Sequence, residues 1–158
     1  MTIRRIIAAV QVIGAVLGVG LLVANAGGGI SFLWLVLLAV HLLVGVAGVG
    51  LWRGTRRGLR GSIVAQAIQM PWIATAHVSY RLGVGLAYWV ALRGGALTHD
   101  RAIGSTFLVE FRQGFGPWVD QFTPTFGVNL VALATGAYLV FTLFAKAAPA
   151  LPNADTST

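Results

Sequence analysis

The chain has 158 residues, of which 57% are hydrophobic and only 9% are Asp, Glu, Lys or Arg. A soluble domain carries about 25% charged residues, so this composition cannot cover a water-facing surface. Together with a mean hydropathy of +0.83, it excludes a soluble enzyme, a nucleic-acid-binding domain and a disordered protein. The composition therefore predicts a chain that is embedded in lipid, so its expected partners include the lipid bilayer.

The formal net charge is +7, from eleven cations and four acids. The cations occur in short runs between apolar stretches, as in Arg4-Arg5 and between residues 53 and 60. Such runs are typical of loops retained in the cytoplasm, whereas a nucleic-acid partner would require cations gathered on a polar face. Cysteine is absent, which excludes disulfides and thiolate chemistry. The Arg-over-Lys bias and the abundant Ala, Val and Gly suggest a high-GC bacterial genome, and hence the bacterial inner membrane.

Four apolar stretches predict membrane-spanning helices, at about residues 6–24, 30–52, 58–77 and 126–145. A spanning helix needs about 20 apolar residues, which the first, second and last stretches provide. The third contains Pro71, which membrane helices tolerate with a kink. Seven of the eleven cations lie on one side of this arrangement, so the positive-inside bias places both termini in the cytoplasm.

Residues 1–26 also fit a secretory signal, because two arginines precede an apolar run and Ala24-Asn25-Ala26 matches a cleavage pattern. The apolar run of about 18 residues is longer than the roughly 7–15 of a signal core. We therefore expect a retained helix. Cleavage would leave three spans.

Residues 78–125 are predicted to face outward and to contain regular structure. Every even position from Val78 to Leu92 is apolar, and this period of two predicts a strand, with a bend at Gly83 and Gly85. A shorter alternation follows at residues 107–112, after the turn-rich segment 93–104, so the sequence predicts a β-hairpin. Its candidate partner-contact residues are Leu86, Tyr88, Val90, Phe107 and Phe111.

An interfacial helix is expected after the hairpin, because aromatic residues recur there at helical spacing: Phe115, Trp118, Phe122 and Phe126. A ligand-stacking platform is the alternative. The predicted fold is therefore an all-α integral membrane protein, with residues 1–146 forming one polytopic domain. It is a four-helix transmembrane bundle with an extracytoplasmic β-hairpin and interfacial helix inserted between its third and fourth helices. Residues 147–158 are expected to form a disordered cytoplasmic tail.

Polar residues within the predicted spans are the candidate functional groups, because burying them without partners is unfavourable. They form a candidate intramembrane polar cluster of His41, Gln69, Gln11 and Gln66, for which interhelical hydrogen bonding and a proton pathway are the two interpretations. A second histidine at matching depth is missing, so no haem or other cofactor is expected. No metal-ligand spacing recurs, and His99, Asp100 and Ser105 lack the turn that frames a catalytic serine.

Small residues indicate close helix packing, either within the monomer or between subunits. The candidate positions are Gly14, Gly18, Gly45, Gly48, Ala132 and Gly136.

The sequence thus favours a non-enzymatic membrane protein that acts as an accessory, assembly or interaction component. Its expected partners are another membrane protein or further copies of the chain, with the hairpin as contact surface, and no nucleic acid. The alternative is a small transporter or channel with a polar path lined by His41, Gln69 and Gln11. A redox subunit that holds haem or quinone is the third class.

Overall fold

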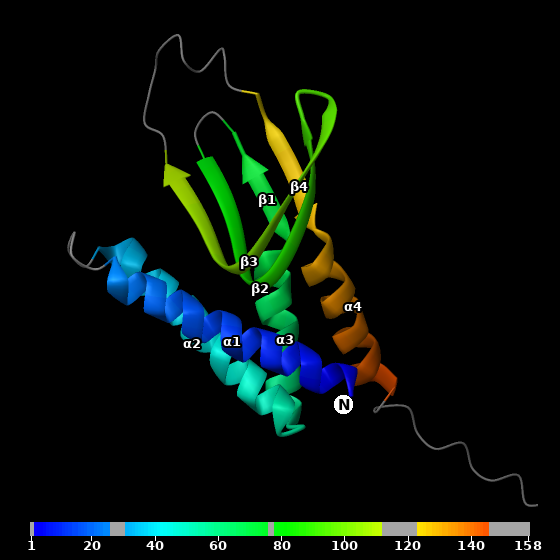
Figure 1. Ribbon diagram of the computed structural model, residues 1–158. Coiled ribbons are helices and arrows are strands. Elements are labelled where there is room, and N and C mark those ends of the chain that lie inside the picture. Colours follow the sequence, from blue (N-terminus) through cyan, green and yellow to red (C-terminus); the bar gives the residue numbers. More distant parts are fainter. Residues whose placement is uncertain (1, 26–30, 76–77, 112–122, 146–158) are drawn as a thin grey trace, which may run out of the picture.

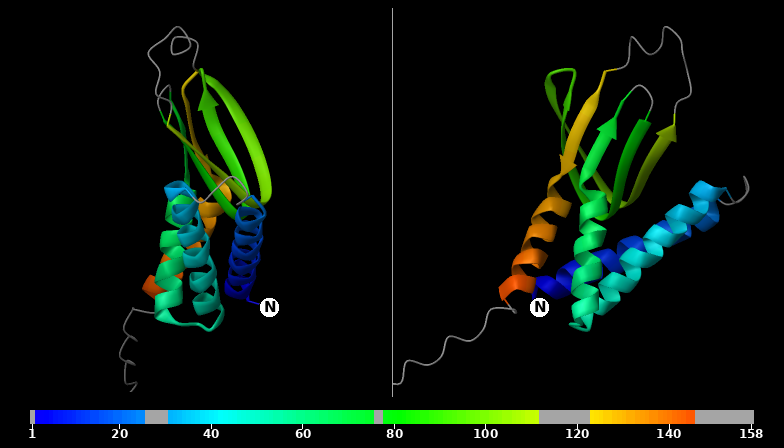
Figure 2. Two further views of the ribbon diagram at one scale, coloured as in Figure 1. Left: turned by 90° about the vertical axis from the view of Figure 1, so that its left-hand side faces the viewer. Right: turned by 180° about the vertical axis from the view of Figure 1, so that it is seen from behind.

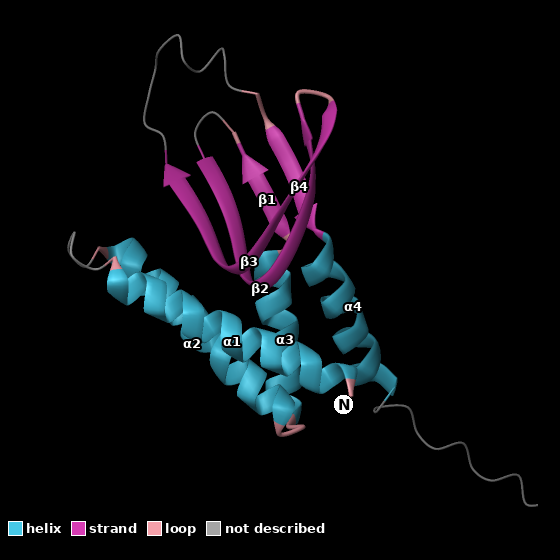
Figure 3. Cartoon of the chain, in the orientation of Figure 1, coloured by secondary structure: helices cyan, strands magenta, loops and turns pink. Residues whose placement is uncertain are grey.

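The computed structural model describes residues 2–25, 31–75, 78–111 and 123–145, and of residues 78 and 104–111 it describes the backbone alone. Four helices lie toward one end of the molecule and an antiparallel sheet lies toward the other (Figures 1 and 3). The elements in chain order are α1 (Ile3–Ala24), α2 (Phe32–Trp52), α3 (Arg56–Gln69), β1 (Pro71–Ala74), β2 (Val78–Arg93), β3 (Ala96–Phe111), β4 (Thr125–Asn129) and α4 (Leu130–Ala145).

The first two helices are long and apolar. α1 has 22 residues and α2 has 21, and both are long and apolar enough to cross a membrane by length and composition. Only 28% of the most apolar window of each helix is buried within the chain. Most of their apolar surface is therefore free to contact lipid or another protein. These two helices are the feature of the structure that is compatible with a membrane.

The predicted four-span bundle is wrong, because the other two helices are too short. α3 has 14 residues, about 21 Å at 1.5 Å per residue, against a hydrocarbon core of about 30 Å. α4 has 16 residues, about 24 Å by the same rise. The remainder of each predicted span is a strand: β1 follows α3, and β4 precedes α4.

Pro71 explains where α3 ends, and Asn129 explains where α4 begins. Pro71 lacks a backbone N–H and disfavours helical geometry in the residue before it, so α3 ends at Gln69 and the chain continues extended. Asn129 begins α4, because its Oδ1 accepts from the N–H groups of Val131 and Ala132 at 3.1 and 3.3 Å.

The predicted hairpin is present, but it is longer than expected and belongs to a four-stranded sheet of order β1-β4-β2-β3. β2 and β3 pair residue for residue from Val78↔Phe111 to Arg93↔Ala96. The turn is therefore Gly94-Gly95, both with positive φ, and the loop predicted at residues 93–104 is largely strand. Two consecutive glycines suit a two-residue hairpin turn that requires this conformation.

The hairpin bends sharply, so that the sheet curls. Gly85 has φ +94° and lies opposite Gly104 in the register. On one side of the bend β2 pairs with β1, and on the other side it pairs with β4, while β1 and β4 also pair with each other. The strands consequently fan out from a common base above α3 and α4 (Figure 2).

The helical core consists of layers, and each layer contains residues from α1, α2 and α3, with Leu139 of α4 joining one of them. An apolar cluster near the N-terminus of α1 contains Ala8, Leu51, Leu59 and Leu139. A second apolar cluster, closer to the sheet, contains Ala15, Val44, Ala65, Leu82 and Val84. The strand β2 thus completes a core that the sequence assigned to helices alone.

Part of the predicted outward insertion lies outside the described residues, namely Phe115, Trp118 and Phe122 of the expected interfacial helix. The predicted tail, residues 147–158, also lies outside them. Phe126 lies in β4 rather than in a helix, and its side chain is 56% exposed.

Candidate functional site

Gln11 and Ser62 form a polar layer between the two apolar clusters of the helical core. Ser62 Oγ donates to Gln11 Oε1 at 2.9 Å and also lies 3.3 Å from the carbonyl oxygen of Ala47. Both side chains are buried. The predicted interhelical hydrogen bond at Gln11 therefore joins α1 to α3, while Gln11 Nε2 is buried and has no hydrogen-bond partner among the described residues.

Gln69 connects α3 to the bent part of the sheet. Its Oε1 accepts from the backbone N–H of Val84 at 2.8 Å, and its Nε2 donates to the carbonyl of Ala65 at 2.9 Å. The neighbouring Tyr80 hydroxyl donates to the carbonyl of Ile68, and burial raises the pKa of this tyrosine. Side chains thus satisfy backbone groups at the end of α3 and beside the bend of β2.

His41 and Gln66 are buried against other parts of the chain. The His41 ring is packed on Gly18 of α1, where a Cβ would overlap it, and its Nδ1 lies 2.8 Å from the carbonyl oxygen of Leu37. Gln66 lies beside Gly136 of α4. The four predicted polar residues are all buried, but Gln11, His41, Gln66 and Gln69 each face a different neighbour.

The small residues singled out in the sequence pack within the chain. Gly45 faces Ala15, Gly48 faces Ala8 and Gln11, and Gly136 faces Met70 and Gln66. Ala132 on α4 is buried.

Gly14 differs from these positions, because its close neighbour is a strand. A Cβ on Gly14 would overlap the backbone of Gly85 at the bend of β2. The small-residue pattern predicts the close approach but not that a strand makes it.

Asn129 joins the sheet to α4. Besides capping α4, its Oδ1 accepts from the N–H of Tyr88 on β2 at 3.2 Å. Its own backbone N–H donates to the carbonyl of Met70 at 2.8 Å, which links the ends of α3 and β4. The residue is fully buried.

A charged cluster that the sequence did not indicate lies within the sheet. The Arg81 guanidinium lies 4.7 Å from the Trp72 ring centroid and 4.0 Å from that of Trp89. It also forms an ion pair of 2.5 Å with Asp100. The hydrogen bond from Arg81 lowers the pKa of the Asp100 carboxyl below its ordinary value. The signal available in the sequence was that Arg81 and Trp89 share the odd-numbered face of β2.

The outer face of the bent hairpin is apolar and continuous with α1. Ile103 is 89% exposed and Leu86 is 48% exposed. Together with Ile13 and Leu17 of α1 they line a depression of about 150 Å³. Among the other predicted contact residues, Tyr88 is exposed and stacks on His99, and Val90 is half-buried. The side chains of Phe107 and Phe111 lie outside the described residues.

β3 is an edge strand. Across the part of the chain that the structure describes, β3 is paired with β2 alone. One row of its backbone N–H and C=O groups is therefore left without a strand partner, and such an edge is a ready template for another chain.

No protein-family model, curated protein or solved structure matches this chain. Over the described residues, no group of three or more His, Cys, Asp or Glu is placed to hold a metal ion.

Proposed function

We propose that this chain is a non-enzymatic component of the bacterial inner membrane, and that it binds another protein of the same membrane. In this proposal α1 and α2 cross the bilayer and their arginine-rich end faces the cytoplasm. The sheet extends toward the opposite side. The hairpin–α1 face, defined as Ile13, Leu17, Leu86 and Ile103 with the adjoining edge of β3, is the contact surface.

The observation that carries this proposal is the open edge of β3 beside a helix suited to span a membrane. Gly14, which touches the bend, lies 11 residues after the start of α1, about 17 Å along a helix of about 33 Å. With α1 across the bilayer, the bend lies near its middle. Unpaired backbone groups at that depth are unfavourable by several kcal/mol each, because lipid offers no hydrogen bonds. Another protein chain can supply those bonds.

The apolar character of the same face agrees with a partner inside the membrane. Ile103 and Leu86 are among the exposed large apolar residues of the hairpin, and Ile13 and Leu17 continue this surface along α1. The transporter alternative has less support, since Gln11 and Gln69 have defined hydrogen-bond partners on neighbouring elements.

The threading is tested by single-cysteine labelling, for which the absence of native cysteine is convenient. We expect a membrane-impermeant maleimide to label Leu97→Cys, near the hairpin turn, in intact spheroplasts. Arg57→Cys, in the first turn of α3, should react only after lysis. Equal labelling of the two positions in intact spheroplasts contradicts the proposed orientation.

The contact surface is tested by a photo-crosslinking amino acid at Ile103 in cells. We expect an adduct with a second protein, whose mass distinguishes another chain from a second copy of this one. Phe141, 73% exposed on α4, is the control position and should give no such adduct. Leu86→Asp should abolish the Ile103 adduct, and Leu97→Asp should leave it unchanged. Adducts with lipid alone at Ile103 would refute the proposal.

A further inference from the structure

A long apolar groove of about 620 Å³ lies between α1 and α2. Valine and leucine make up half of its lining residues, and Ala15, Gly45 and Gly50 add further small, apolar positions. His41 lies near one end, and Arg53 and Thr55 lie at the other. The 12 residues from His41 to Arg53 correspond to about 18 Å of helix, close to the roughly 15 Å of one leaflet of the hydrocarbon core.

A second apolar depression, of about 450 Å³, adjoins this groove. Ala9, Ile13 and Trp52 line it, and it shares Val12, Val49 and Arg53 with the first. Arg53 therefore lines both depressions. This shape matches a molecule with two apolar chains and one anionic group.

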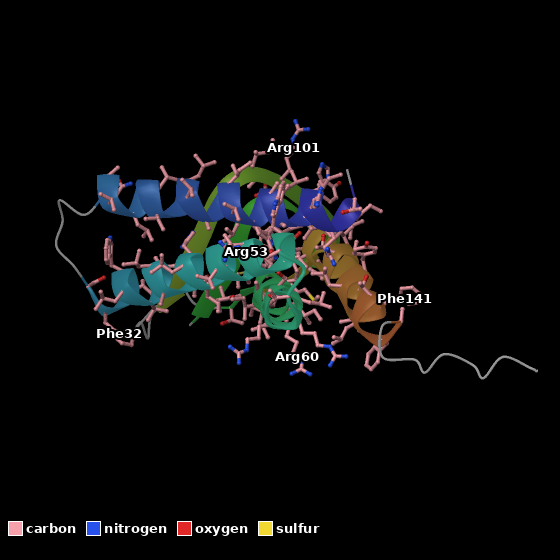
Figure 4. The ribbon with its side chains drawn as sticks, turned by 90° about the horizontal axis from the view of Figure 1, so that it is seen from below. Phe32, Arg53, Arg60, Arg101 and Phe141 are labelled. Atoms are coloured by element: carbon pink, nitrogen blue, oxygen red, sulfur yellow. The ribbon has the colours of Figure 1, made fainter. Side chains whose placement is uncertain are left out.

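Arg53 is available for an anion from outside the chain. It is exposed, and Asp100, the one acidic residue whose side chain the structure describes, pairs with Arg81 in the sheet. Arg5, placed over the Trp52 ring at 5.8 Å, adds a second cation at this end. Seen from below, Arg53 lies between α1 and α2, whereas Arg60 projects away from the helices (Figure 4).

We propose that this groove holds an anionic phospholipid of the cytoplasmic leaflet. Its phosphate is bound by the Arg53 guanidinium, and its acyl chains occupy the two apolar depressions. Guanidinium groups suit this role because they offer several donors to phosphate oxygens. The inference goes beyond the protein-binding function and shares with it only the placement of α1 and α2 in the membrane.

The test is native mass spectrometry of the purified protein after exchange into detergent with equal phosphatidylglycerol and phosphatidylcholine. We expect one phosphatidylglycerol to be retained in preference to phosphatidylcholine. Arg53→Gln should weaken this retention about fivefold, the effect of one cation at an anionic lipid surface. Arg60→Gln removes the same charge outside the groove and should leave retention unchanged. Val46→Trp should reduce retention with every arginine present, because Val46 lines the groove and is 71% exposed.

Three results overturn the inference. Equal losses in Arg53→Gln and Arg60→Gln mean that surface charge alone attracts the lipid. Unchanged retention in Val46→Trp means that the acyl chains lie elsewhere, and equal retention of both lipids means that the net negative charge of the lipid is not recognised. The Ile103 crosslink in the Val46→Trp variant reports the protein-binding function separately, so failure of either proposal is recognised without the other.

Discussion

Replacing Gln69 with methionine tests whether this buried amide supports the fold or a transport path. Methionine has a similar length but cannot accept the hydrogen bond from the N–H of Val84, which is 2.8 Å long in the native chain. A buried N–H left without an acceptor is unfavourable by about 1–3 kcal/mol. The lost bond to the Ala65 carbonyl adds little, because that oxygen also accepts within the helix. We therefore expect the free energy of unfolding to fall by about 2 kcal/mol.

For a chain of this length, that change lowers Tm by about 4–8 °C. The assay is thermal unfolding of the detergent-solubilised protein, followed by tryptophan fluorescence, since Trp89 is buried in the sheet. Gln66→Met is the matched control: it lies on the same helix and is buried, but its side chain makes no hydrogen bond with the described residues. Equal Tm values for the two variants would show that the bond at the bend does not stabilise the chain.

Three further outcomes follow from the same contacts. Asn129→Ala should reduce the free energy of unfolding by about 2–4 kcal/mol, because a helix cap is lost and a buried strand N–H is left unpaired; unchanged denaturation would contradict this. Gly14→Ala should be destabilising by about 1–3 kcal/mol, since the new Cβ meets backbone, whereas Gly20→Ala, with open space around it, should be neutral or stabilising in the same denaturation assay. Asp100→Asn should reduce the free energy of unfolding by about 1 kcal/mol or less at pH 7, because the ion pair with Arg81 is lost. The folded pKa of Asp100 is lowered, so this difference should vanish as pH falls below about 3.9 and through the folded pKa; a difference that persists in acid refutes the assignment.

The sequence predicted the elements whose periodicity extends over many residues. α1 and α2 arise from apolar runs long enough to define a helix, and the period of two in β2 persists for fifteen positions. β1 and β4 could not be found in this way, because they are 4 and 5 residues long within apolar runs. Over so short a run, periodicity does not separate a strand from a helix.

The sequence analysis did not predict the first half of β3, residues 96–103, as a strand, and the reason is a different one. Residues 96–103 do not alternate apolar and polar, and none of them is fully buried, so even the half-buried face at 98, 100 and 102 accepts polar residues. The sequence signal that was available is the pair Gly94-Gly95, which favours a two-residue turn and therefore a hairpin that begins at once.

For the candidate site, the sequence identified four polar residues that are buried, but neither Ser62 nor the groups that these residues contact. Burial follows from the apolar surroundings of Gln11, His41 and Gln69, whereas their partners depend on how helices are rotated and on a strand packed beside them. The sequence does not indicate the Arg81 cluster for the same reason, since Trp72 lies in β1, a segment that the apolar pattern predicts as helix. Ile103 was missed because it lies in the segment interpreted as a loop.

Three of the polar side chains described above pair backbone groups near the junctions between helices and strands, and this bears on the proposed partner. A chain that changes from helix to strand leaves backbone groups unpaired at each junction. Tyr80 satisfies the carbonyl of Ile68 at the end of α3, Gln69 satisfies the N–H of Val84 at the bend, and Asn129 satisfies N–H groups of both β2 and α4. The outward edge of β3 is served by none of these side chains, although apolar residues surround its bend. At these three places in the described part of the chain, a side chain of the chain itself pairs the backbone groups. The edge of β3 has no such side chain among the described residues, which is why we propose it, rather than another surface, as the contact for a second protein.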